Sequence, residues 1–138
     1  MRIVVCDAGP ILHLREAGAL DLLARAGEVL VPPAVDREQQ TLMADWSTGR
    51  PSWVRIARLS EEAARQAEQM RTIGELGLGE AEAIALARSL PPDWLLTDDA
   101  AARLVASLLG LEVHGSLGVI VTRLGGPSNA FRDSGLAQ

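Results

Sequence analysis

The feature that most constrains the fold is an alternation of short apolar runs with longer segments of helical spacing. Runs of strand length occur at residues 3–6, 28–31, 54–59, 94–97 and 112–114. Strands that alternate with helices predict an α/β domain with a largely parallel sheet. At 138 residues the chain has room for one such domain with a single core.

Start and stop signals place the helices between these runs. Proline in the first turn at Pro33, the cap residue Ser60 and the terminating Gly110 are the clearest of them. We expect helices over residues 10–14, 20–27, 34–46, 60–70, 78–90, 100–109 and 115–124. The segment STGRPS that follows Trp46 predicts a surface loop, and residues 125–138 predict a flexible tail.

Composition excludes several compartments and chemistries. The single cysteine, Cys6, cannot form a disulfide within the chain and is expected in the core. No apolar run reaches the ~20 residues needed to cross a bilayer, so we expect a cytoplasmic protein. All 13 basic residues are arginine, and without lysine the chain can be neither a P-loop enzyme nor a Schiff-base enzyme.

Acidic residues directly follow two of the predicted strands. Asp7 comes after the first strand, and Asp98 and Asp99 come after the run WLLT. Ligands of an open parallel sheet collect at the carboxyl ends of its strands, so these carboxylates are expected at one edge. Carboxylates crowded together raise one another's proton affinity unless a cation neutralises them. The pattern therefore favours a metal site.

Each acid also has an ordinary structural interpretation. Asp7, and one of Asp98 and Asp99, would serve as helix caps. Glu80 and Glu82 lie near a helix start, where the helix dipole favours an acid, and Glu38 in DREQQ would lie on a solvated helix face.

Five segments together carry a more specific pattern. VVCDAGPILHL, VPPAVDRE, LGLGEAEAIALA, LLTDDAAAR and GLEVHGSLGVI resemble, in order and spacing, those of PIN-domain proteins, especially a bacterial and archaeal branch close to VapC-type toxins. The resemblance implies a three-layer α/β/α fold with a mainly parallel central sheet over residues 1–124. It also implies a ribonuclease, with RNA as substrate and an antitoxin protein as partner. PIN-like proteins are commonly dimers, and the small side chains of the alanine-rich segment Ser60–Met70 would let helices approach closely, so we expect a homodimer that uses helices in the central region.

The resemblance further implies the site. Its catalytic residues would be Asp7, Glu38, Glu80 and Asp99, with Asp98 as an additional metal ligand and Glu82 as a less certain neighbour. Hard carboxylate ligands suit Mg²⁺ or Mn²⁺, which would activate water at a phosphodiester. Arg103, four residues after Asp99 on one helix, is the expected phosphate contact. His13 and His114 are isolated in the sequence and are interpreted as ordinary polar or core residues.

Two departures from the family pattern keep other interpretations open. Ala8 and Gly9 replace a hydroxyl or amide that commonly follows the first acid, and the chain ends soon after GSLGVI. A net charge of -5 also lacks the basic footprint of a nucleic-acid binder, although bound cations reverse the local field. The alternative is a catalytically weak or inactive PIN-like protein-interaction module. An aspartyl-phosphate phosphatase or receiver domain is disfavoured because such sites need a lysine.

Overall fold

The computed structural model describes residues 2–124, and its centre is a five-stranded sheet in which every pairing is parallel. The strand order is β3-β2-β1-β4-β5. The strands are β1 (Ile3–Cys6), β2 (Glu28–Val31), β3 (Val54–Ile56), β4 (Trp94–Leu96) and β5 (Val113–His114). The predicted α/β class and parallel sheet are confirmed.

Helices connect successive strands. They are α1 (Ala8–Glu16), α2 (Leu20–Ala26), α3 (Pro33–Leu42), α4 (Trp46–Gly49), α5 (Glu61–Gly74), α6 (Leu78–Ser89), α7 (Ala100–Leu108) and α8 (Ser116–Leu124). Three predicted caps are present, since Asp7, Ser60 and Asp99 accept hydrogen bonds from the backbone N–H groups of Ala8, Ala63 and Ala102.

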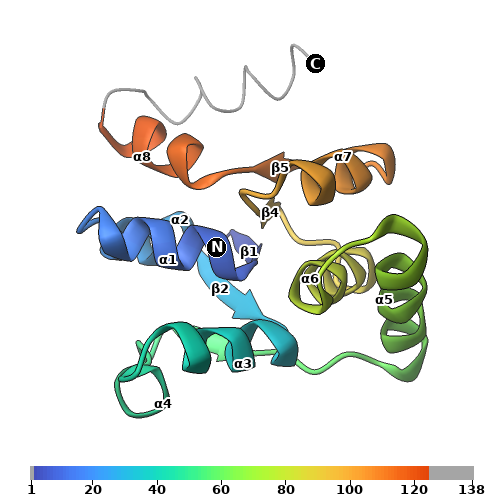
Figure 1. Cartoon of the computed structure of the whole chain (residues 1–138). Coiled ribbons are helices and arrows are strands. Elements are labelled where there is room, and N and C mark those ends of the chain that lie inside the picture. The colour runs from blue at the N-terminus through green and yellow to red at the C-terminus, as the bar shows by residue number, and fades with distance from the viewer. Residues whose placement is uncertain (1, 125–138) are drawn as a thin grey trace.

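Two apolar cores cover the two faces of the sheet, which makes three layers (Figure 1). Val4 and Cys6 of β1 belong to the first core with residues of α1, α2, α3 and α8. Val5, between them, belongs to the second core with residues of α5, α6 and α7. Successive side chains of a strand point to opposite faces, so strands buried on both sides are apolar throughout.

The region of residues 34–50 differs from expectation. The predicted helix 34–46 ends at Leu42, and the predicted loop STGRPS begins inside the short helix α4. The helix breaks after Leu42 because Met43 and Trp46 are buried in the core. Asp36 holds Trp46 and Arg50 in place by accepting hydrogen bonds from Trp46 Nε1 at 2.8 Å and from Arg50 Nη1 at 3.3 Å. Tertiary contacts therefore override local propensity here.

The predicted tail of residues 125–138 lies outside the described residues. Within residues 2–124, none of the helices has the length and apolar character that a membrane span requires.

Candidate metal and phosphodiester site

The acids predicted from separate segments meet at the carboxyl edge of the sheet. Because β1 and β4 are parallel neighbours, Asp7 and the Asp98–Asp99 pair leave the sheet side by side. They line a cavity of ≈ 390 Å³ together with acids from α3 and α6. The lining residues are Asp7, Ala8, Gly9, His13, Glu38, Gly77, Glu80, Asp98 and Asp99.

Asp7 is the most buried of these acids, with 4% of its surface exposed. Its Oδ1 accepts a hydrogen bond from the Ala8 N–H at 2.7 Å, and its Oδ2 accepts one from Thr97 Oγ1 at 2.9 Å. Burial raises the pKa of Asp7 to about 6, and the charges of Glu38 and Asp99 add to the rise while the two hydrogen bonds oppose it. A buried carboxylate with this environment favours a cation beside it.

Glu38 lies against the first turn of α6. Its carboxylate accepts a hydrogen bond from the backbone of Gly79, and a Cβ atom at position 79 would collide with Glu38 Oε1. Burial raises the pKa of Glu38, and the negative charges of Glu80 and Glu82 raise it further. Glycine at position 79 is thus what allows the carboxylate to approach the helix backbone.

Glu80 and Glu82 are two residues apart on α6 and point in different directions. Glu80 accepts a hydrogen bond from the Gly77 N–H at 2.8 Å and lines the cavity, where burial and the charges of Asp7 and Asp99 raise its pKa. Glu82 instead accepts from the Ala34 N–H at 2.8 Å, at the first turn of α3. Glu82 therefore joins α6 to α3 and does not line the cavity.

Asp98 and Asp99 also divide their roles. Asp99 Oδ2 caps α7 by accepting from the Ala102 N–H at 2.9 Å. Asp98 accepts from the Ser116 N–H at 2.7 Å, from Ser116 Oγ at 2.8 Å and contacts His13 Nδ1 at 2.6 Å. Burial acts to raise the pKa of Asp98, but these hydrogen bonds outweigh it and lower the pKa below the usual value. Both of its oxygens are already engaged.

The two histidines, which are isolated in the sequence, each contact an acid in the structure. His13 reaches Asp98, 85 residues away in sequence, and lines the acidic cavity. His114 contacts Glu112 at 2.8 Å and packs edge-on against Trp94, with ring centroids 5.1 Å apart. The sequence could have indicated the place of His13, because His13 lies four residues after Gly9 on the helix that Asp7 caps. His13 and Gly9 therefore share one face of α1.

Arg103 lies next to the cavity wall without being among its lining residues. A Cβ atom on Gly115 would be 2.6 Å from Arg103 Nη1 and 2.7 Å from Asp98 Oδ1, so both groups lie over that glycine. The exposed guanidinium is thus close to the acidic edge.

The donor set fits a hard divalent cation in its chemistry. Five carboxylates line one cavity, and for Asp7, Glu38 and Glu80 the pKa is raised in part by neighbouring negative charge, which a cation would neutralise. Within residues 2–124, no three Asp, Glu, His or Cys side chains are arranged to hold an ion as they stand.

Comparison with known proteins agrees with the fold. A family model described as PIN domain matches residues 3–124. The crystal structure of Mycobacterium tuberculosis VapC20, a sarcin-ricin loop cleaving toxin, superposes with a TM-score of 0.59 at 18% sequence identity, covering 78% of this chain and 95% of that one. No curated protein is similar enough in sequence to count as a match.

Proposed function

Since the chain belongs to the PIN-domain family, we propose that it is a metal-dependent endoribonuclease that hydrolyses phosphodiester bonds in RNA, and the toxin of a toxin-antitoxin pair. The observation that carries this proposal is the convergence of five carboxylates from four separated segments on one cavity at the carboxyl edge of the sheet. A solved structure of similar fold belongs to an RNA-cleaving toxin, which supports the choice of RNA.

Asp7, Glu38, Glu80 and Asp99 are the residues that would hold Mg²⁺ or Mn²⁺. The bound ion would activate water and stabilise negative charge at the phosphodiester. Asp98 was also predicted as a ligand, but its contacts with Ser116 and His13 suit it better to positioning. Arg103, at the cavity wall, would bind a phosphate of the RNA through its guanidinium.

The alternative is an inactive PIN-like interaction module. Two observations favour it: Ala8 and Gly9 supply no hydroxyl beside Asp7, and within residues 2–124 no three Asp, Glu, His or Cys side chains are grouped so that they could hold an ion. Cleavage separates the two functions, because an interaction module would bind a partner protein without turning over RNA.

The test is cleavage of a labelled single-stranded RNA by the wild type and by Asp7→Asn, with Mg²⁺, with Mn²⁺ and after chelation. Substituting a residue that only supports a metal ligand typically lowers metal affinity or activity by about 10–100-fold. Loss of a ligand itself should therefore lower the cleavage rate by about 100-fold or more. Asp45→Asn is the matched control, since Asp45 is an exposed acid outside the cavity that pairs with Arg15. Equal rates in wild type and Asp7→Asn, or cleavage that survives chelation, would refute the proposed function.

A further inference from the structure

His13 differs in chemistry from every other residue that lines the acidic cavity. Of the nine lining residues, five are carboxylates and three are alanine or glycine. We propose that His13 is a substrate-contacting residue that accepts a hydrogen bond from a ribose 2′-hydroxyl, so that the site prefers RNA over DNA. This inference rests on the proposed function and names the residue that would recognise the ribose.

Asp98 determines which nitrogen of His13 is free. The Asp98 carboxylate is held by two hydrogen bonds from Ser116, and its Oδ2 lies 2.6 Å from His13 Nδ1. A carboxylate only accepts hydrogen bonds, so Nδ1 carries the proton. In the neutral ring, Nε2 is then an acceptor, and the ring is oriented by its contact with Asp98.

The surroundings leave the ring accessible from the cavity. The His13 side chain is 53% exposed, although Asp98 is only 20% exposed. A Cβ atom on Gly9 would lie 3.9 Å from His13 Cε1, in van der Waals contact, so glycine at this position leaves that edge of the imidazole uncovered. Ala8 and Gly9 offer no side-chain polar group, which leaves His13 as the polar side chain on this side of the cavity.

The hydrogen-bonding groups of the cavity match those of ribose. The cavity presents carboxylate oxygens and one imidazole nitrogen, all acceptors. A DNA backbone presents only acceptors in its phosphates and sugars, whereas RNA adds one donor per nucleotide, the 2′-hydroxyl. Cations bound by the acids would attract the phosphates of RNA and DNA alike, whereas an acceptor nitrogen of His13 would distinguish the two only through the 2′-hydroxyl.

The test measures binding of a fluorescein-labelled single-stranded oligonucleotide of mixed sequence, made once as RNA and once as DNA. Anisotropy titrations use Ca²⁺ as the cation, with the oligonucleotide checked for intactness on a gel. We expect the wild type to bind RNA more tightly than DNA. His13→Ala should weaken RNA binding by about 3- to 10-fold, the worth of one hydrogen bond, and DNA binding by less than about 2-fold.

Two variants test the geometry. His13→Gln retains an amide donor for Asp98 and an amide acceptor, so it should keep part of the preference for RNA. Asp98→Asn should reduce that preference because it releases the ring. His114→Ala is the matched control, a histidine outside the cavity whose loss should leave the RNA-to-DNA ratio unchanged. Thermal melts confirm that each variant is folded, and if His13→Ala is not, His13→Leu provides the same comparison because it also lacks a hydrogen-bonding group.

Equal weakening of RNA and DNA binding would overturn the inference, because it would show a charged imidazole bound to phosphate. No weakening, or a wild type without preference for RNA, would also overturn it. These failures are distinct from failure of the proposed function: a protein that prefers RNA through His13 without cleaving it would refute the nuclease only.

Discussion

Asp7, Glu80 and Asp99 have the structural roles that the sequence suggests for them and also lie at the predicted metal site. Asp7 and Asp99 cap α1 and α7, and Glu80 accepts from the backbone at the start of α6, yet all three line one cavity. Capping holds each carboxylate at a helix N-terminus, where the partial positive charge favours an anion. A helix cap and a metal ligand are therefore compatible roles for these residues.

The crowding of carboxylates has a measurable consequence for stability. Asp7 has a pKa of about 6 in the folded chain, above its ordinary value of 3.8, so the folded state binds this proton more tightly. Its contribution to stability is full below the unfolded value and is lost as pH rises through about 6. Without divalent cations, lowering the pH from 7 to 5 should raise the free energy of unfolding by roughly 1.4 kcal/mol, with Glu38 and Glu80 acting in the same direction.

Denaturant unfolding at both pH values measures this change. Asp7→Asn should flatten the pH dependence and be more stable than the wild type at pH 7, since it removes a buried charge. Saturating Mg²⁺ should also flatten it, because the cation competes with protons. A metal-free wild type that loses stability between pH 7 and pH 5 would contradict the interpretation of these acids as a crowded cluster.

At this scale the sequence identified the acids and missed their polar partners. Asp7, Asp98 and Asp99 could be found because each follows a strand. Helical spacing from Gly9 could place His13 on the cavity side of α1, but its contact with Asp98 could not be predicted, because Asp98 follows β4, 85 residues away in sequence.

The first turn of α6 is the element on which the position of Glu38 depends. Gly79 is buried, and Glu38 occupies the space where a side chain at 79 would lie. Gly79→Ala should therefore displace the Glu38 carboxylate from the cavity, while alanine itself favours the helix by about 1 kcal/mol relative to glycine. Loss of the site without loss of the fold is the expected combination.

Thermal melts of the wild type and Gly79→Ala, with and without Mn²⁺, measure whether the metal site is lost. An ion that binds only the folded chain raises the melting temperature. At about 100 times its Kd, the ion adds about 2.7 kcal/mol to the free energy of unfolding. Gly79→Ala should abolish most of that increase. Gly49→Ala on α4 is the control, because the nearest atom to a Cβ there is Asp45 Oδ2 at 3.9 Å. If both variants keep the full Mn²⁺ effect, Glu38 is not a ligand.

Element boundaries were predictable where a local signal sets them and were not where packing does. Ser60 and Asp99 cap α5 and α7 as their residue types indicate. The break between α3 and α4 depends on Asp36 accepting hydrogen bonds from Trp46 and Arg50, and the sequence around Trp46 does not predict these hydrogen bonds.

For the whole molecule, the decisive information is the strand order. The sequence predicts that acids follow β1 and β4, but only the order β3-β2-β1-β4-β5 makes those strands neighbours. Glu38 and Glu80 reach the same edge because α3 packs on α6, which is a property of the assembled core. The class of fold was therefore predictable, and the closeness of the four acids depended on the resemblance.

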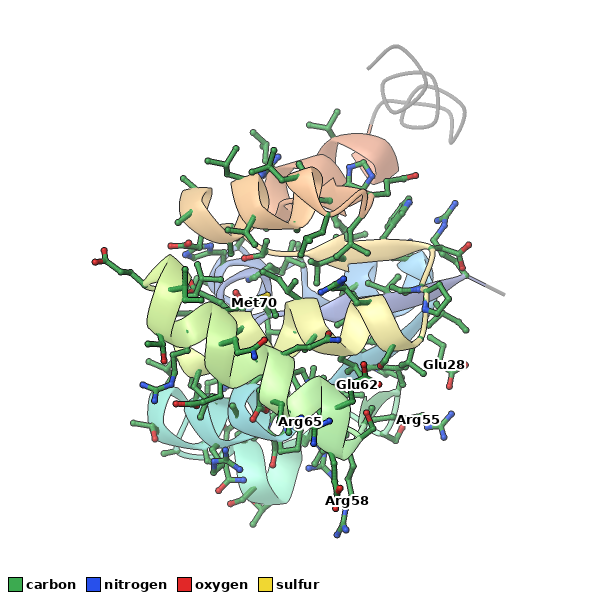
Figure 2. The ribbon with its side chains drawn as sticks, turned by 90° about the vertical axis from the view of Figure 1, so that its right-hand side faces the viewer. Glu28, Arg55, Arg58, Glu62, Arg65 and Met70 are labelled. Carbon is green, nitrogen blue, oxygen red and sulfur yellow. The ribbon has the colours of Figure 1, made fainter. Side chains whose placement is uncertain are left out.

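The distribution of arginine bears on the net charge of -5. Figure 2 shows Arg55, Arg58 and Arg65 gathered around the start of α5, with Arg55 paired to Glu28. A second cavity there is lined by residues from the start of α5 and the end of α6, whereas Glu80 lies at the start of α6. These arginines are therefore at the opposite end of α6 from the acidic cavity and do not neutralise it.

Self-association was predicted from the small side chains of the segment Ser60–Met70, and the structure changes which surface is available. Ala63 and Ala67 of that segment are 3% and 1% exposed and pack in the core beside α6. Small residues that allow a close approach of helices are thus already used within the chain. A homodimer built on this alanine face would have to separate α5 from α6.

We therefore expect the homodimer to use α7, where Leu104 and Leu108 lie one helical turn apart and are 62% and 78% exposed. Burying both on a two-fold axis would remove apolar surface from water and bring Arg103 and the acidic edge of each subunit near the interface. Light scattering at rising micromolar concentration should give a dimer mass for the wild type and a monomer mass for Leu104→Glu with Leu108→Glu. Ile73→Glu on α5, where Ile73 is 83% exposed, is the control and should remain dimeric. A monomeric wild type at every concentration would refute the dimer, and a dimer that only Ile73→Glu dissociates would return the interface to α5.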